Sequence, residues 1–238
     1  GEERRAVVKI EAVPKPMRDA ILAAEDERFY QHGGVDYSGV LRAALSNFVS
    51  GGARQGASTI TMQVARNFFL SKEKTLTRKF NEMLLAFKIE HNLSKDQILE
   101  LYVNQIFLGQ RAYGFAAASQ IYFGKTRDQL SLAETAMLAG LPKAPSRFDP
   151  VVNPQRAKLR QQYVLRRMRE LNFISDAQWQ LADKQPLVVK KEVNDFAVKA
   201  DHLAEMVRQV LYERFRDDAY TRGFKVYTTL STVHQQAA

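Results

Sequence analysis

The stretch EDERFYQHGGVD, residues 25–36, is the segment around which the rest of the chain is organised. Two adjacent carboxylates, Glu25 and Asp26, follow the apolar run ILAA at 21–24, and Gly33-Gly34 then ends any helix. An acid at such a helix end can project from an apolar face into a cleft. Partial desolvation there raises the pKa of a carboxyl toward the range useful for proton transfer. A solvated helix end is the alternative interpretation of the same residues.

The composition is that of a globular protein. The chain has 238 residues, of which 45% are hydrophobic and 26% charged, so it can bury a core as one large domain or two smaller lobes. The formal net charge of +9 points to an anionic partner. Nucleic acid, membrane phospholipid and a phosphorylated substrate are all anionic, and the net charge alone does not distinguish among them.

Cysteine is absent, which excludes disulfides, thiolate nucleophiles and cysteine-ligated zinc. The four histidines lack metal-ligand spacing, so no metal-binding residues are predicted. The longest uncharged run, 112–124, is too short to cross a bilayer. The chain starts without an initiator Met or a signal peptide. We therefore expect a piece of a longer protein, with any membrane anchor upstream of residue 1.

Helical patterns dominate the chain. Pro14 and Pro16 predict the start of a helix that runs into the acidic stretch, and Asp36 is a predicted N-cap for the next helix. A third helix is expected to begin near Ser58 or Thr59. Apolar periodicity predicts further helices at 72–92, 114–123 and 153–172. Capping boxes predict helix starts at Ser94, Ser131 and Ser175.

Little sheet is expected. The alternating stretch 7–13 and the stretch 226–230 have the pattern of short strands. Within the predicted helix 72–92, one stripe at helical spacing is expected to be buried, namely Leu76, Phe80, Met83, Leu84 and Phe87. The chain is therefore predicted to be mainly α-helical.

A second acid, Glu82, lies in a basic setting. Arg78 and Lys79 precede it by four and three residues, so all three share one helix face. Five cations lie within residues 66–79, among them Arg66, Lys72 and Lys74. Such a density of cations suits a pyrophosphate. The alternative is an exposed ion pair worth ~0.3 kcal/mol.

Two further patterns are weaker. The loop Gly56–Thr59 leads into a helix with Thr61, Gln63 and Asn67, and its free backbone N–H groups could hold an anionic or sugar ligand. An ordinary N-cap is the alternative. Residues 95–104 place Glu100 and Asn104 on one helix face, which alone is typical of an ordinary amphipathic helix.

The order and spacing of these motifs are more specific than any one of them. They read Glu25-Asp26-x-x-Phe29-x-x-His32-x-Gly34, then GASTITMQ at 56–63, Arg78-Lys79-x-x-Glu82, and KDQILELYVN at 95–104. A fifth block, ETAMLAGLPKAP, spans 134–145. Together they closely resemble the peptidoglycan glycosyltransferases of family 51 over residues 10–170. The tail GFKVYTTL, 223–230, is similar to the lead-in to the transpeptidase half of class A penicillin-binding proteins.

The resemblance implies a mainly α, lysozyme-like glycosyltransferase fold with a large lobe and a smaller membrane-facing lobe. The glycosyltransferase domain would span 1–222, with the small lobe at approximately 48–92. Residues 223–238 would begin a linker toward a transpeptidase domain. The implied activity is polymerisation of lipid II into β-1,4-linked glycan strands with release of undecaprenyl pyrophosphate.

The resemblance also assigns roles. Glu25 matches the family's general base, and Glu82 matches its second acidic catalytic residue. The positions implied to bind substrate are Asp26, Phe29, His32, Gly56, Ser58, Thr59, Gln63, Arg66, Asn67, Arg78, Lys79, Glu100 and Asn104. Two positions depart from the pattern, because Arg66 stands where many members carry Lys, and Met62 where many carry Gln.

The implied partners are lipid II, a lipid-linked glycan chain, the membrane surface and other cell-wall synthesis proteins, with no nucleic acid. The implied location is the periplasmic face of the bacterial cytoplasmic membrane, with an anchoring helix upstream. No dense carboxylate cluster demands a metal cofactor, and a divalent cation, Mg²⁺ or Mn²⁺, could assist at the pyrophosphate. The apolar run 68–70, beside lysines, is expected to dip into the membrane interface, with a core position as the alternative.

Two other functions compete. A muralytic glycoside hydrolase of lysozyme-like fold would need an acid near the scissile oxygen, but no cradle of cations for a pyrophosphate. A non-catalytic basic module for membrane or nucleic acid would leave Glu25 and Glu82 without a role.

Overall fold

The computed structural model describes residues 8–41, 58–69, 76–190, 201–216 and 226. The chain divides into two compact units, residues 1–191 and 192–238, so the predicted domain boundary at residue 222 falls inside the second unit. Among the described residues the elements are α-helices and short 3₁₀-helices, and the β-structure is an isolated bridge between Phe107 and Tyr113. The predicted mainly α class is confirmed.

Three helices form the centre of the first unit. Helices α1 (Lys15–Glu25), α7 (Leu132–Gly140) and α9 (Pro154–Glu170) pack against one another. As predicted, α1 begins directly after Pro14, with Pro16 in its first turn, where a missing N–H leaves no bond unmade. Around this centre lie shorter elements, namely α6 (Phe115–Phe123), α8 (Pro145–Phe148), α10 (Asp176–Lys184) and the 3₁₀-helices Arg127–Gln129 and Leu141–Lys143.

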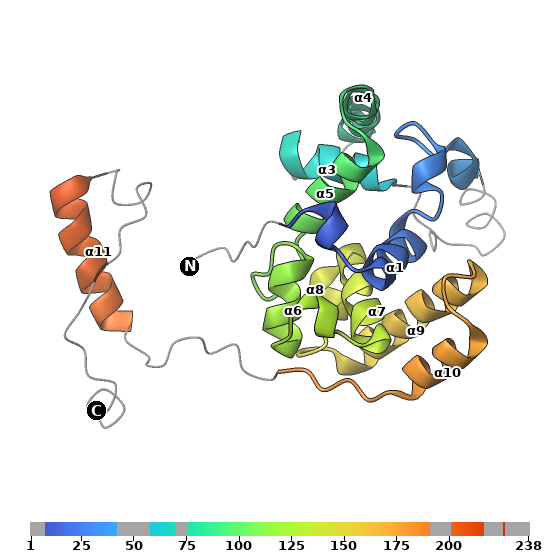
Figure 1. Ribbon diagram of the computed structural model, residues 1–238. Coiled ribbons are helices and arrows are strands. Elements are labelled where there is room, and N and C mark those ends of the chain that lie inside the picture. The colour runs from blue at the N-terminus through green and yellow to red at the C-terminus, as the bar shows by residue number, and fades with distance from the viewer. Residues whose placement is uncertain (1–7, 42–57, 70–75, 191–200, 217–225, 227–238) are drawn as a thin grey trace. The chain divides into compact units, whose positions relative to one another are not determined.

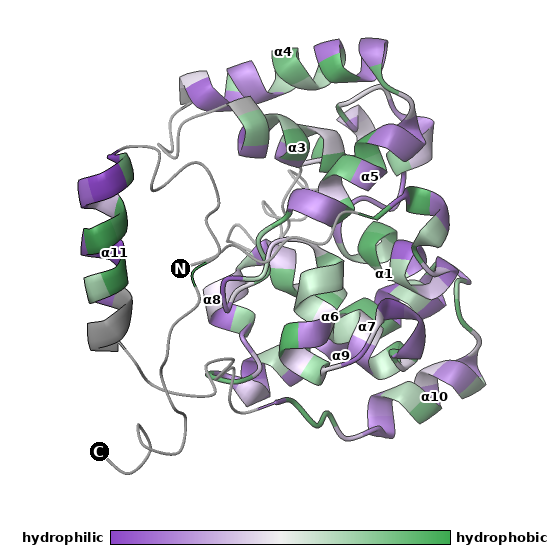
Figure 2. Ribbon diagram, turned by 60° about the vertical axis from the view of Figure 1, so that its left-hand side comes forward, coloured by the Kyte–Doolittle hydropathy of each residue, from purple (hydrophilic) through white to green (hydrophobic). Residues whose placement is uncertain are grey.

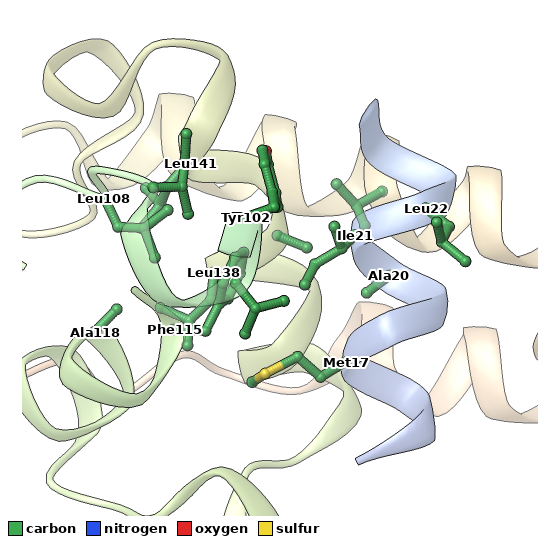
Figure 3. Packing of buried hydrophobic residues seen from close by; sticks show 14 of the residues in the cluster. Met17, Ala20, Ile21, Leu22, Tyr102, Leu108, Phe115, Ala118, Leu138 and Leu141 are labelled. Carbon is green, nitrogen blue, oxygen red and sulfur yellow. The ribbon is translucent and has the colours of Figure 1, made fainter. Parts of the chain in front are cut away.

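The main core fixes the end of α1. Met17 and Ile21 of this helix are buried opposite Tyr102, Phe115 and Leu138 (Figure 3). Tyr102 belongs to α5 (Lys95–Gln105), which begins at the predicted capping box of Ser94. Because the helix is held by this packing, the carboxylates at its C-terminus have a defined position.

A second layer lies over α5. Helix α3 (Ile60–Phe69) packs against both α5 and α4 (Leu76–Asn92) (Figure 1). A separate small cluster of Val35, Met62 and Ala86 lies beneath α4. Gly34 has φ of +95°, and a Cβ there would lie 3.1 Å from the Ala86 backbone, so this close approach requires glycine.

The predicted buried stripe on α4 is wrong at three positions, whereas Met83 is partly buried against the small cluster of Val35, Met62 and Ala86. Phe80, Leu84 and Phe87 are 60%, 50% and 39% exposed, while Glu82 and Ala86 are fully buried. Helix α4 is covered on the side that faces α3, so its opposite apolar stripe remains at the surface. The Leu76 side chain lies outside the described residues.

The predicted strand at 7–13 is also wrong. Its residues include the 3₁₀-helix Ile10–Ala12, because side chains of α5, and not a neighbouring strand, take up the backbone groups of Val8 and Ile10. Asp36 is confirmed as a helix start, since its carboxylate accepts a hydrogen bond from the Gly39 amide at 3.0 Å. Capping boxes at Ser131 and Ser175 are confirmed. The predicted strand 226–230 lies outside the described residues except for residue 226.

The second unit contains helix α11 (Asp201–Phe215). Among the helices that the structure describes, none is both long and apolar enough to cross a membrane. Hydrophobic and hydrophilic residues alternate along the helices of both units (Figure 2).

Candidate active site

Glu25 is the last residue of α1, and its side chain is about one-tenth exposed. One carboxylate oxygen accepts a hydrogen bond from Gln63 Nε2 at 3.0 Å. The other lies 3.4 Å from a terminal guanidinium nitrogen of Arg160. Helices α1, α3 and α9 therefore meet at this single carboxylate.

The environment of Glu25 has opposing effects on its pKa. Burial raises the pKa of this carboxyl, while Arg160, the hydrogen bond from Gln63, and the more distant cations Lys143 and Arg66 lower it, and the net result is a raised pKa. Such a group is ionised at neutral pH less readily than an ordinary glutamate, and in its ionised form it is a stronger base. The prediction of a partly desolvated acid at this position is confirmed.

Tyr102 of α5 is affected electrostatically by the same carboxylate. Its side chain is 1% exposed, and among the described residues its hydroxyl finds no hydrogen-bond partner. Burial and the charge of Glu25 raise the pKa of this phenol well above its usual value. The hydroxyl is thus held neutral, as a potential donor, in the wall of the site.

Asp26 has a different role from its neighbour. Its carboxylate contacts His32 Nε2 at 2.9 and 3.0 Å and accepts a hydrogen bond from the Ile60 amide at 3.0 Å. The side chains of Asp26 and His32 are 3% and 4% exposed. Because Ile60 is the first residue of α3, Asp26 ties the end of α1 to the start of the helix that carries Gln63.

Glu82 forms a second charged centre on α4. Its side chain is fully buried, and its two oxygens are paired separately, one with Arg78 Nη1 and the other with Lys79 Nζ at 2.9 Å. The Lys79 ammonium also donates to Ser58 Oγ at 2.6 Å. The predicted grouping of these three residues on one helix face is confirmed.

The start of α3 connects the two centres. Ser58 contacts Lys79, and Gln63, five residues later, contacts Glu25. Five residues of chain span at most roughly 18 Å between Cα atoms, and the helical turn from Ile60 shortens this. The Thr59 hydroxyl donates to the Gly34 carbonyl at 2.6 Å and accepts from the Met62 amide at 3.1 Å, which fixes the same helix start.

Other predicted substrate-binding residues are engaged with the protein itself. Phe29 is fully buried in the core. Asn104 forms hydrogen bonds of 2.8 Å with both backbone groups of Val8, and Glu100 accepts from the Ile10 amide at 2.9 Å. These contacts give the three residues structural roles, and their assignment to substrate stays a prediction.

The remaining predicted positions differ in exposure. Arg66 is half-buried and acts electrostatically on Glu25, whereas Asn67 is exposed. Gly56, Lys72 and Lys74 lie outside the described residues.

Three residues of the site were not assigned from the sequence, namely Arg160, Lys143 and Tyr102. A signal existed for Arg160, because on α9 it occupies the stripe of Ala157, Val164 and Met168, which are all buried. A charged residue in a buried apolar stripe requires a partner. Tyr102 lies on the apolar face of its helix, where a core role is the ordinary expectation, and the sequence holds no signal that Glu25 acts on its phenol.

The residues around Glu82 do not form a ready metal site. Both carboxylate oxygens are already engaged by cations, and across the described ranges no group of three or more His, Cys, Asp or Glu side chains could hold a metal ion. We therefore derive no step through a metal.

Comparisons with known proteins give a consistent result. A family described as transglycosylase matches residues 1–169. Penicillin-binding protein 1A of Neisseria cinerea is 60% identical over the whole chain, and that of Escherichia coli K12 is 50% identical. The chain spans 30% and 28% of these two relatives. A crystal structure of penicillin-binding protein 1A from Haemophilus influenzae aligns with 92% of this chain and 23% of its own, with 32% identity and a TM-score of 0.56.

Proposed function

The chain belongs to the transglycosylase family, and we propose that it polymerises lipid II into β-1,4-linked glycan strands with release of undecaprenyl pyrophosphate. The single observation that carries the proposal is the isolated, partly desolvated Glu25 beside a separate cationic centre. The first suits removal of a proton and the second suits an anionic leaving group.

In the proposed reaction Glu25 takes the proton from the acceptor sugar hydroxyl as that oxygen bonds to the anomeric carbon of the donor. The bond from the anomeric carbon to the phosphate oxygen breaks, and its electron pair leaves with the pyrophosphate. Gln63 donates a hydrogen bond to the Glu25 carboxylate during this step. A base positioned in this way contributes ~10²–10⁴-fold to the rate.

Arg78 and Lys79 are proposed to stabilise the departing pyrophosphate. Glu82 holds both cations from beneath and is itself fully buried, so it fixes their positions without facing the ligand as an anion. Charge on the pyrophosphate grows as the anomeric bond breaks, and fixed cations therefore favour the transition state over the ground state.

The hydrolase alternative predicts a different substrate. A raised pKa at Glu25 would also suit a general acid, but a neutral sugar leaving group gains nothing from the Arg78–Lys79 pair. Incubation of the protein with labelled lipid II in detergent should yield polymer, and incubation with purified glycan strands alone should release no fragments. Fragment release without polymer would replace the proposal by the hydrolase.

The proposal includes a place at the outer face of the cytoplasmic membrane, where a lipid-linked substrate is accessible. The relatives are penicillin-binding proteins, which supports a longer protein whose residues 223–238 lead toward a transpeptidase domain. The exposed stripe of Phe80, Leu84 and Phe87, next to the exposed Lys88, supports contact of α4 with the lipid headgroup boundary.

Flotation with vesicles of phosphatidylglycerol and phosphatidylcholine tests this contact. The double variant Phe80→Ser, Leu84→Ser should float less than wild type, because it removes apolar area from the stripe. A matched control is Leu159→Ser, Leu181→Ser, since these leucines are 67% and 77% exposed on other helices. Equal flotation of both double variants and wild type would remove α4 from the contact.

A further inference from the structure

We propose that Arg160 is the positioning residue of the Glu25 carboxylate, which keeps this group ionised and aimed while it acts as base. The inference rests on the proposed function and adds to it a residue from α9, more than one hundred positions away in the sequence. It stands on the 3.4 Å approach of the guanidinium to Glu25 and on the way the protein holds this guanidinium.

Arg160 is fixed along its whole length. Its side chain is 7% exposed, and its Nε donates to the Gly140 carbonyl at 3.2 Å. The guanidinium carbon lies 4.5 Å from the centre of the Tyr163 ring and 5.9 Å from that of Phe148. A guanidinium held by a hydrogen bond and two aromatic rings has few alternative positions, so it presents one geometry to its carboxylate.

The residue at 140 makes room for this arrangement. A Cβ built on Gly140 would lie 2.8 Å from Arg160 Cγ, which is too close for any side chain larger than hydrogen. Helix α7 thus ends on the one residue that lets the Arg160 stem pass beside it to reach Glu25. Gly140 therefore provides both the space for the Arg160 side chain and the carbonyl that accepts its hydrogen bond.

Arg160 differs from the other charged groups around Glu25. Lys143 of the 3₁₀-helix Leu141–Lys143 and Arg66 of α3 lower the pKa of Glu25 less than Arg160 does. Gln63 of α3 is uncharged. Tyr102 of α5 is the neighbouring titratable group on which both Glu25 and Asp26 act. Arg160 has the largest effect that opposes burial on the pKa of Glu25. A carboxylate in this cleft without Arg160 would hold its proton to higher pH.

The test is the pH dependence of lipid II polymerisation in Arg160→Met. Loss of the cation raises the pKa of Glu25, so the acidic limb of kcat/KM should move to higher pH. We expect the rate to fall about tenfold at pH 6 relative to wild type and to recover most of this loss at alkaline pH. Arg160→Lys, which keeps a cation, should show a smaller displacement of the acidic limb.

Arg156→Met is the matched control, because Arg156 is exposed on the same helix and its loss changes the net charge equally. Its pH profile should coincide with that of wild type. Arg160→Gln serves as a second uncharged variant if Arg160→Met does not fold. Circular dichroism establishes folding for each.

Three results would overturn the proposal: an unchanged acidic limb in a folded uncharged variant, an equal loss of rate at every pH, or failure of both uncharged variants to fold. The last two would make Arg160 a structural residue only. Absence of polymer with the wild-type protein would instead refute the proposed function, so the two failures are distinguishable.

Discussion

Glu25 and Glu82 are both largely buried carboxylates with arginine partners, but they differ in the number and the origin of the groups that contact them. Each oxygen of Glu82 has its own cation, and both cations come from the same helix, three and four residues away. In the described part of the chain the cation in contact with Glu25 is Arg160, 3.4 Å distant on a remote helix, and the other oxygen of Glu25 is held by a neutral amide. The difference separates a fully paired anchor from a carboxylate that is left able to take a proton.

This contrast explains how one site can contain two acids with different roles. Local i,i+3 and i,i+4 contacts within α4 join Arg78 and Lys79 to Glu82. The Glu25 centre depends on the packing of α1, α3 and α9, so its chemistry is set by tertiary structure. Changes that neutralise either acid should therefore have different consequences.

The largest effect is expected from Glu25→Gln. This change keeps the shape of the side chain and removes the base, so polymerisation should fall by ~10²–10⁴-fold. Glu11→Gln, at an exposed position, is the control and should retain the wild-type rate. Near-normal turnover in folded Glu25→Gln protein would show that Glu25 is not the base.

The same variant should not be less stable at pH 7. The pKa of Glu25 is raised above its ordinary value of 4.5, so the folded state binds this proton more tightly than the unfolded state does. The stability that this group contributes is fully present below its ordinary pKa and is lost as the pH rises through the raised pKa. Melting temperatures of Glu25→Gln should equal or exceed those of wild type at pH 7, and the difference should shrink in acid.

An intermediate effect is expected at the second centre. Lys79→Met should lower kcat by about 10²-fold with a smaller change in KM, because a fixed cation acts mainly on the transition state. Its effect on the free energy of unfolding should be roughly 1–3 kcal/mol, because one oxygen of the fully buried Glu82 loses its donor. Lys184→Met, at an exposed position on α10, is the control.

Glu82→Gln should have a smaller effect than Lys79→Met. Both cations remain, but each loses a charged partner, and loss of one charge-assisted hydrogen bond of ~1.4 kcal/mol corresponds to about tenfold in rate. Polymerisation rates and melting temperatures of both variants should be measured together. A loss of rate in Glu82→Gln as large as that in Glu25→Gln would mean that Glu82 takes a direct part in the chemistry.

The comparison also shows which parts of the site were open to prediction from the sequence. The Arg78–Lys79–Glu82 grouping follows from helical spacing, because its contacts are local. The Gln63 contact to Glu25 is not local, and the resemblance to a known family implied only that Gln63 binds substrate. Arg160 lies outside the motifs that carried this resemblance, and no local rule joins it to Glu25.

The fold was predictable to a similar degree. Helix starts at Pro14, Asp36 and Ser94 were predicted correctly, because capping and proline effects act within a few residues. The burial of α4 was predicted wrongly, because periodicity locates an apolar stripe but does not say whether another element covers it. Here the stripe is uncovered, which makes it the basis for the proposed membrane contact.

The smallest effect, and the finest test of the comparison, is expected from Gln63→Leu. This change removes the hydrogen bond to Glu25 and leaves Arg160 in place, so the carboxylate loses orientation but keeps its cation. The pKa of Glu25 should rise further, because Gln63 lowers it, though less than Arg160 does. The acidic limb of kcat/KM should therefore move to higher pH by less than in Arg160→Met, and the rate at alkaline pH should approach that of wild type. The free energy of unfolding should change by ~0.5–1.5 kcal/mol.

Gln155→Leu, at an exposed position on α9, controls for the substitution itself. A larger displacement in Gln63→Leu than in Arg160→Met would mean that the amide of α3, and not the guanidinium of α9, is what keeps Glu25 ready to accept a proton.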